Sequence, residues 1–99
     1  MAYSAMVLDT TMQTIVARLP QVPASLLDGQ GMLVSTKRGE AVVVNGVGYF
    51  IWQKLETPST IADLANTLVA EYGISPPQAV EDVRRYIQRL QALELVQCS

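Results

Sequence analysis

Histidine is absent from the sequence, and cysteine occurs once, at Cys98. Histidine is the side chain that most often serves as a general base, and it is the usual nitrogen ligand of zinc. A single thiol cannot close an internal disulfide, and neither it nor the scattered serines have a recognisable activating partner. We therefore expect a protein that is not an enzyme, binds no metal and needs no cofactor.

Charged residues are also scarce, at 16% of the 99 residues. Seven basic against nine acidic side chains give a formal net charge of −2, which offers no general attraction to nucleic acid or to an anionic membrane. The first eight residues hold no lysine, no arginine and no long apolar run, so we expect neither a secretory signal nor a membrane span. The expectation is a cytoplasmic protein with one domain and a single core.

Between residues 40 and 55 the sequence changes from a strand-like run of apolar residues to apolar residues at helical spacing. Residues 41–44 form a short run typical of a strand, and Asn45 and Gly46 then tolerate positive φ, which predicts a turn. From Val47 the apolar residues recur with helical spacing. Those positions are Val47, Phe50, Ile51 and Leu55, with Trp52 beside them. The sequence thus predicts a strand that leads directly into a helix.

Two further strands are predicted ahead of residues 40–44. Residues 24–27 and 32–35 flank a glycine-rich turn, so the three segments make three antiparallel strands. Residues 95–96 are left open, as a short final strand or as a segment that only packs. Residues 1–19 are also left open, because their apolar positions suit a helix or a strand equally. The helical set is Leu8, Met12, Ile15, Val16 and Leu19, and the strand set is Ile15, Ala17 and Leu19.

The second and third helices have clear starts and stops. The second begins near Thr60 and stops at Gly73, and the third is capped by Ser75, has proline in its first turn and runs to about residue 93. The apolar stripe of the third helix is wider than one contact needs, so this helix could line a groove. Its centre is Ala79, Val83, Ile87 and Leu90, its shoulders are Val80, Tyr86 and Leu93, and Asp82 and Arg89 lie immediately outside them.

The aromatic and basic side chains admit both a structural and a functional interpretation. We predict that Phe50, Trp52 and Tyr72 are core or near-core anchors and not platforms for a stacked ligand. Three arginines of the third helix could contact phosphates, as in a winged helix whose third helix enters the major groove. They are Arg84, Arg85 and Arg89, and because Glu81 and Asp82 adjoin them we favour a solvated face.

A turn-rich strand pair is followed, in order, by VVVNGVGYFIWQKL, TIADL, LVAEYGI and VEDVRRYIQRL. This ordered set resembles the PqqD-like family of small winged-helix domains known as precursor-peptide recognition elements. Such domains occur alone or fused to enzymes that make ribosomally synthesised, post-translationally modified peptides, including pyrroloquinoline quinone and lasso peptides. The resemblance implies an α+β winged helix-turn-helix fold, with a three-stranded antiparallel sheet followed by three helices. It covers residues 22–96 and leaves residues 1–21 as an N-terminal extension.

The resemblance also implies a non-catalytic adaptor. The leader segment of a precursor peptide would add as a strand to the third strand, in a groove beside the third helix. The adaptor would present the leader to a radical enzyme, a leader protease or a cyclase, with no part for nucleic acid or a membrane. The implied backbone pairing falls on Ala41, Val42, Val43 and Val44, and the implied groove wall is Asp82, Val83, Tyr86 and Arg89.

Two alternatives stay open at this point. One is a winged-helix regulator that binds DNA through the three arginines of the third helix and loses affinity as salt rises. The other is a purely structural dimerisation module, which would self-associate and respond to neither ligand. Residues 1–21 could pair with a second copy in a homodimer or cover the edge of the third strand.

Overall fold

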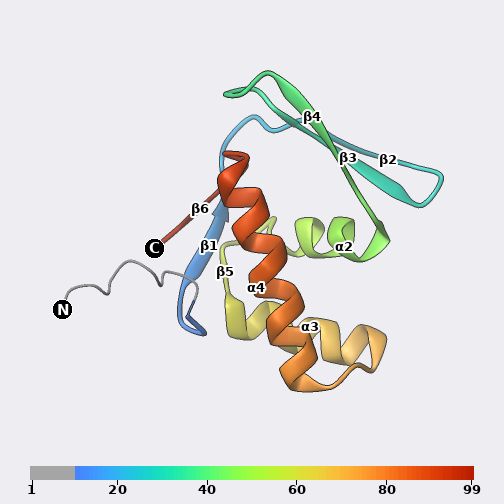
Figure 1. The fold of residues 1–99 in the computed structure, drawn as a ribbon, viewed down its shortest axis with the longest axis vertical. Coiled ribbons are helices and arrows are strands. Elements are labelled where there is room, and N and C mark those ends of the chain that lie inside the picture. Colours follow the sequence, from blue (N-terminus) through green and yellow to red (C-terminus); the bar gives the residue numbers. More distant parts are fainter. Residues whose placement is uncertain (1–10) are drawn as a thin grey trace.

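The computed structural model describes residues 11–99, which have an α+β fold with two small antiparallel sheets and three helices (Figure 1). Strands β5, β1 and β6 form one sheet, and strands β2, β3 and β4 form the other. The predicted fold class is confirmed. The elements are β1 (Ile15–Arg18), β2 (Ala24–Leu27), β3 (Gln30–Ser35), β4 (Glu40–Val44), α2 (Gly46–Lys54), β5 (Ser59–Thr60), α3 (Ile61–Tyr72), α4 (Pro76–Ala92) and β6 (Val96–Cys98).

The sheet β2-β3-β4 contains the three predicted antiparallel strands, which are confirmed. Leu33 in the middle strand lies opposite Val42 of β4. Leu33, Val42 and Val44 are buried, whereas the alternate residues Met32 and Val43 are exposed. Alternation of this kind is what an antiparallel sheet shows when one face lies on the core and the other faces solvent.

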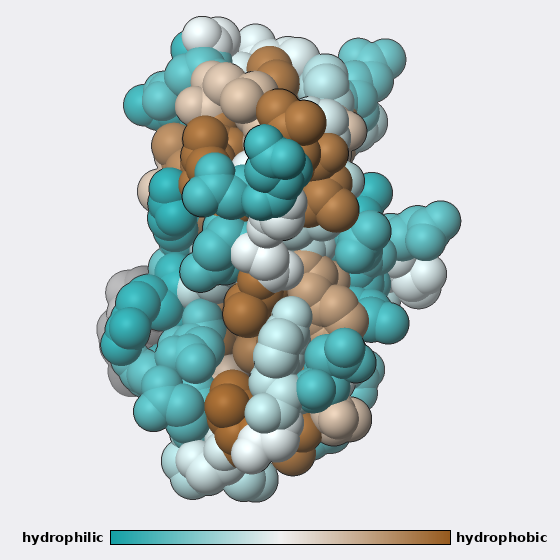
Figure 2. Space-filling view, turned by 90° about the vertical axis from the view of Figure 1, so that its right-hand side faces the viewer, coloured by the Kyte–Doolittle hydropathy of each residue, from teal (hydrophilic) through white to brown (hydrophobic). Residues whose placement is uncertain are grey.

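The hairpin of β2 and β3 extends past the helices at one end of the molecule (Figure 1). Leu26 and Leu27, at the end of β2, are 55% and 74% exposed. Figure 2 shows apolar side chains gathered over the upper part of the molecule, where this sheet lies. The end of the sheet away from α4 therefore presents apolar surface to solvent.

The other end of this sheet is tied to α4 through Ser35, which is fully buried. The Ser35 hydroxyl donates to the carbonyl of Leu93 at 2.8 Å and accepts from the N–H of Arg38 at 3.3 Å. The Arg38 guanidinium lies 3.0 Å from the carboxylate of Glu40 and 3.8 Å from that of Glu94. These contacts join β3 and β4 to the end of α4, and they set where β4 lies relative to that helix.

Strand β4 passes directly into α2, as the sequence predicts. The residue between them is the N-cap Asn45, whose side-chain Oδ1 accepts from the N–H of Gly48 at 2.8 Å. The predicted positive-φ turn at Asn45 and Gly46 is wrong, because Asn45 has φ of −76° and neither residue is among those with positive φ. An asparagine side chain that satisfies a free N–H of the first helical turn removes the need for such a turn.

Helices α3 and α4 begin and end where the sequence predicts. The Thr60 hydroxyl accepts from the N–H of Asp63 at 3.1 Å, and Gly73 ends α3 with a φ of 68°. The Ser75 hydroxyl accepts from the N–H of Gln78 at 3.3 Å. The predicted centre of the stripe on α4, residues Ala79, Val83, Ile87 and Leu90, is fully buried. None of the helices in residues 11–99 is long and apolar enough to cross a membrane.

The ambiguous N-terminal segment contains a strand, β1. It lies between β5 and β6, with Val16 opposite Cys98 and Arg18 opposite Val96. Val16 is fully buried, whereas Ile15 is 46% exposed. Residues 15–18 therefore join the core, although they fall in the expected extension 1–21, and they pair with β5 and β6 and not with β4. Residues 1–10 of that extension lie outside the described residues.

The aromatic predictions have mixed outcomes. Trp52 is 2% exposed, which confirms it as a core anchor. Phe50 is half-buried, and its ring meets that of Tyr72 edge to face, with 5.6 Å between centroids. Tyr72 itself is 44% exposed, so its predicted place near the core is wrong. It is the last residue of α3, and its ring contacts that of Phe50.

Candidate functional site

Strand β4 has one unpaired edge in the described part of the chain, because β3 is its only neighbour there. The direction of the backbone groups follows from β3. The N–H of Val34 donates to the carbonyl of Pro23 at 3.0 Å, so the backbone of Val34 faces β2 and that of Leu33 faces β4. Leu33 lies opposite Val42, which must therefore direct its N–H and C=O to β3. By alternation, Ala41 and Val43 direct theirs to the open edge.

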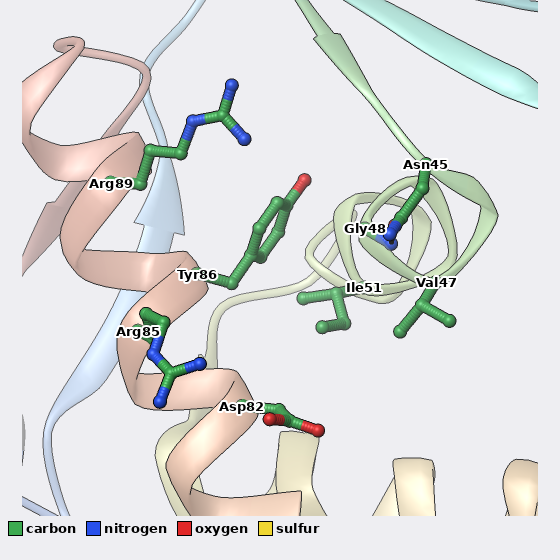
Figure 3. Close-up of a pocket in the computed structure, with 8 residues that line it drawn as sticks. All are labelled: Asn45, Val47, Gly48, Ile51, Asp82, Arg85, Tyr86 and Arg89. Atoms are coloured by element: carbon green, nitrogen blue, oxygen red, sulfur yellow. Dashed lines mark hydrogen bonds between the residues drawn. The ribbon is translucent and has the colours of Figure 1, made fainter.

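A cavity of about 420 Å³ lies beside this edge, between the first turns of α2 and the middle of α4 (Figure 3). Tyr86 projects from α4 toward α2, and Ile51 projects from α2 toward α4. Its lining is Asn45, Val47, Gly48 and Ile51 from the side of α2, and Asp82, Arg85, Tyr86 and Arg89 from α4.

The closeness of α2 and α4 depends on Gly48. A Cβ atom at this position would lie 3.0 Å from Cε1 of Tyr86 and 3.2 Å from Cβ of Val44. Such contacts are tighter than side chains normally allow, so the absence of a side chain lets the Tyr86 ring lie against the first turn of α2. Gly48 therefore shapes the floor of the cavity where β4 ends.

The hydroxyl of Tyr86 is buried and has no hydrogen-bond partner in residues 11–99. Burial raises the pKa of this phenol above its ordinary value, and the nearby positive charge of Arg89 lowers it by less. The hydroxyl is therefore protonated at neutral pH and available as a donor. An unpaired buried hydroxyl costs stability, so an acceptor that enters the cavity and bonds to it would be stabilised.

Charge is distributed unevenly along the α4 side of the cavity. Asp82 accepts from the side-chain amide of Gln78 at 2.8 Å, and Arg85 pairs with Glu81 at 2.9 Å. Arg89 makes no salt bridge with any residue of the described range. In Figure 3 Asp82 and Arg89 stand at opposite ends, with Tyr86 between them. Asp82 and Arg85 share one end of the cavity, and the other end, at Arg89, is positive.

Comparison with known proteins identifies the family. Residues 30–96, about two thirds of the chain, match the family model described as Coenzyme PQQ synthesis protein D (PqqD). The chain belongs to the PqqD family. This confirms the resemblance seen in the sequence.

Two solved structures share the PqqD-family fold of this chain. One is TbiB1 in complex with the TbiA(beta) leader peptide, at 23% identity and a TM-score of 0.74, covering 82% of this chain and 94% of that one. The other is lasso peptide synthetase B1 complexed with the leader peptide, at 22% identity and a TM-score of 0.71, covering 83% and 96%. A search of the curated proteins found no match.

The predicted site residues of this PqqD-family chain fall into three groups. Asp82, Tyr86 and Arg89 line the cavity together. Val83 does not line it, because its side chain is fully buried in the core. The four β4 residues lie at the neighbouring edge, where the side chains of Val42 and Val44 face the core and those of Ala41 and Val43 do not. That any of them binds a peptide stays a prediction.

Sequence reasoning missed the contribution of α2 to the cavity. The missed residues are Asn45, Val47, Gly48, Ile51 and, from α4, Arg85. The sequence did hold a signal for the α2 residues. A helix that begins directly after a strand must place its first turn beside the end of that strand. No such signal distinguishes Arg85 from the other arginines of α4.

Replacing Gly48 with alanine is expected to destabilise this PqqD-family protein by about 1 kcal/mol, because the added methyl group crowds Tyr86 and Val44. The better helix propensity of alanine offsets part of that cost. Urea denaturation would measure the change. Gly46→Ala is the matched control, since its Cβ would meet only the carbonyl oxygen of Gly29, at 3.4 Å. Equal effects of the two substitutions would contradict the proposed close contact.

Proposed function

We propose that this protein is a non-catalytic adaptor that binds the leader segment of a ribosomally made precursor peptide and presents it to modifying enzymes. The observation that carries the proposal is the open edge of β4 beside the cavity on α4. The family match supports it, and so do the two structures of similar fold, both of which hold leader peptides.

The proposed binding mode is addition of the leader as an extra strand next to β4. Ala41 and Val43 would exchange backbone hydrogen bonds with it, because their N–H and C=O groups face the open edge. Leader residues beside Val42 and Val44 would then turn their side chains inward, two residues apart. The backbone bonds would supply affinity with little demand on sequence, and the inward side chains would supply specificity.

The position beside Val44 is the one nearest the cavity. Val44 ends β4, Asn45 caps α2, and Gly48 lies against both Val44 and Tyr86. An inward leader side chain at this position would therefore enter the space between α2 and α4. That placement assigns the cavity the role of a side-chain pocket for one leader residue.

DNA binding has less support. The formal net charge is −2, and one of the three arginines on α4, Arg85, is paired with Glu81 at 2.9 Å. A winged-helix DNA reader depends on free cations to neutralise phosphates. Binding of a leader peptide by strand addition, which the two similar structures support, does not depend on free cations.

The proposed adaptor works in the cytoplasm and passes the bound leader to a radical enzyme, a leader protease or a cyclase. It acts as a monomer or as a homodimer. The absence of histidine and the single thiol support a role without chemistry of its own. Sedimentation of the full chain with and without peptide would determine whether two copies form the binding unit.

The test uses peptides selected from a random display library on the full 99-residue chain, followed by NMR with a selected peptide. We expect the amide hydrogens of Ala41 and Val43 to exchange more slowly in the complex, because they gain hydrogen bonds. The amides of Val42 and Val44 should be protected already in the free protein, since they bond to β3. Recovery of no binding peptide, or protection that changes far from β4 and α4, would overturn the proposed function.

A further inference from the structure

The cavity between α2 and α4 offers hydrogen-bond donors that nothing in the described residues uses. The Tyr86 hydroxyl is buried and unpartnered. Arg89 is exposed and makes no salt bridge within residues 11–99. Asn45 uses its side-chain oxygen to cap α2, so its amide nitrogen remains as a donor on the α2 side of the cavity. Arg89 and Asn45 are exposed and can turn to a ligand, whereas the buried Tyr86 hydroxyl gains a hydrogen bond only if an acceptor enters the cavity.

The first turn of α2 adds to the positive character of the α2 side of the cavity. The turn contains no acidic residue, although the N-terminal end of a helix favours negative charge. Asp82, the one carboxylate of the lining, lies at the end of the cavity opposite Arg89 and already accepts from Gln78. A negative group would therefore be held at the Arg89 end without facing Asp82 closely.

We propose that this cavity selects an acidic side chain of the leader, whose carboxylate is held by Arg89, Tyr86 and Asn45. The inference rests on the proposed function, because it assigns the acidic residue to the leader position beside Val44. Val47 and Ile51 supply the apolar wall against which the stem of a glutamate lies. A carboxylate fits better than a neutral acceptor, since a hydrogen bond to a charged group is shorter and stronger.

The experiment begins with the peptides recovered from the random display library. We expect those that protect Ala41 and Val43 to share one aspartate or glutamate at a fixed position. A glutamate-to-glutamine change at that position should weaken binding about tenfold, because it replaces charge-assisted hydrogen bonds with weaker neutral ones. Peptides that bind at β4 without any acidic preference would overturn the inference and leave the proposed function intact. Failure to recover any peptide would overturn both.

Variants of the protein identify which side chains read the carboxylate. The Arg89→Gln variant should bind the acidic peptide about tenfold more weakly than the wild type does. Its affinity for the glutamine peptide should be no lower than that of the wild type. Arg84→Gln is the matched control, since it removes the same charge from the same helix but lies outside the lining of the cavity. Equal losses in the two variants would mean a general charge effect and would overturn the inference.

Tyr86→Phe separates a binding role of the hydroxyl from a structural one. The substitution removes a buried donor without a partner, so the free protein should be as stable as the wild type or more stable. The same variant should bind the acidic peptide at least threefold more weakly, at a cost of about 0.65 kcal/mol. Unchanged affinity for the acidic peptide would remove Tyr86 from the site.

Discussion

Replacing Val43 with proline is expected to weaken peptide binding at least about tenfold while the protein stays folded. The N–H of Val43 faces the open edge of β4, so proline would remove a donor that the leader needs and none that β3 needs. The proline ring would also occupy the place of the incoming strand. Proline is tolerated on edge strands where the lost N–H faces outward. Isothermal titration with a selected peptide would measure the loss.

Two further substitutions make this test specific to one edge. Leu26→Pro is the matched control, because β2 is the opposite edge strand and the same alternation turns the N–H of Leu26 away from β3. It should leave peptide affinity unchanged. Val42→Pro should instead unfold or strongly destabilise the protein, since the N–H of Val42 bonds to β3. Full affinity in the Val43→Pro variant would show that the leader does not pair with β4.

Trp52→Ala is expected to cause the largest loss of stability, roughly 3–5 kcal/mol out of a typical total of about 5–15 kcal/mol. Trp52 is 2% exposed, so its removal would leave a cavity in the core. The guanidinium of Arg18 lies 4.5 Å from the centroid of the Trp52 ring, and its Nε donates to the Trp52 carbonyl at 3.1 Å. The indole therefore also anchors β1 to α2, and its loss would loosen both.

Urea denaturation followed by circular dichroism would measure this loss. Tyr72→Ala is a suitable control, because Tyr72 is 44% exposed and is not among the residues of the core. Its cost should stay well below that of Trp52→Ala, since it loses one aromatic pair, worth ~0.5–1.5 kcal/mol, and only part of a ring's buried area. Trp52→Phe should fall between the two, since it keeps a ring in the core but loses part of its volume. A Trp52→Ala variant that unfolds at the wild-type urea concentration would show that the ring is not an anchor.

Signals that act within a few residues were correctly predicted from the sequence. The caps at Thr60 and Ser75, the stop at Gly73 and the stripe of α4 all depend on contacts between near neighbours in the chain. The strand-to-helix change at Asn45 was located, yet its mechanism was not. At that position an asparagine can either cap the helix with its side chain or adopt positive φ in a turn. Only the direction of the following helix decides which of the two occurs.

The sequence by itself determined the order of the elements, their caps and the stripe of α4, because each depends on neighbouring residues. Contacts between distant residues decided the rest. Strand β1 is a strand because β6, some eighty residues away, pairs with it, and this pairing buries Val16. The cavity lies where Gly48 lets Tyr86 approach α2. Val47, an expected core residue, lines this cavity, whereas Val83, an expected lining residue, is buried in the core. Periodicity shows which face of a helix is apolar, but the neighbouring elements decide how much of that face they cover.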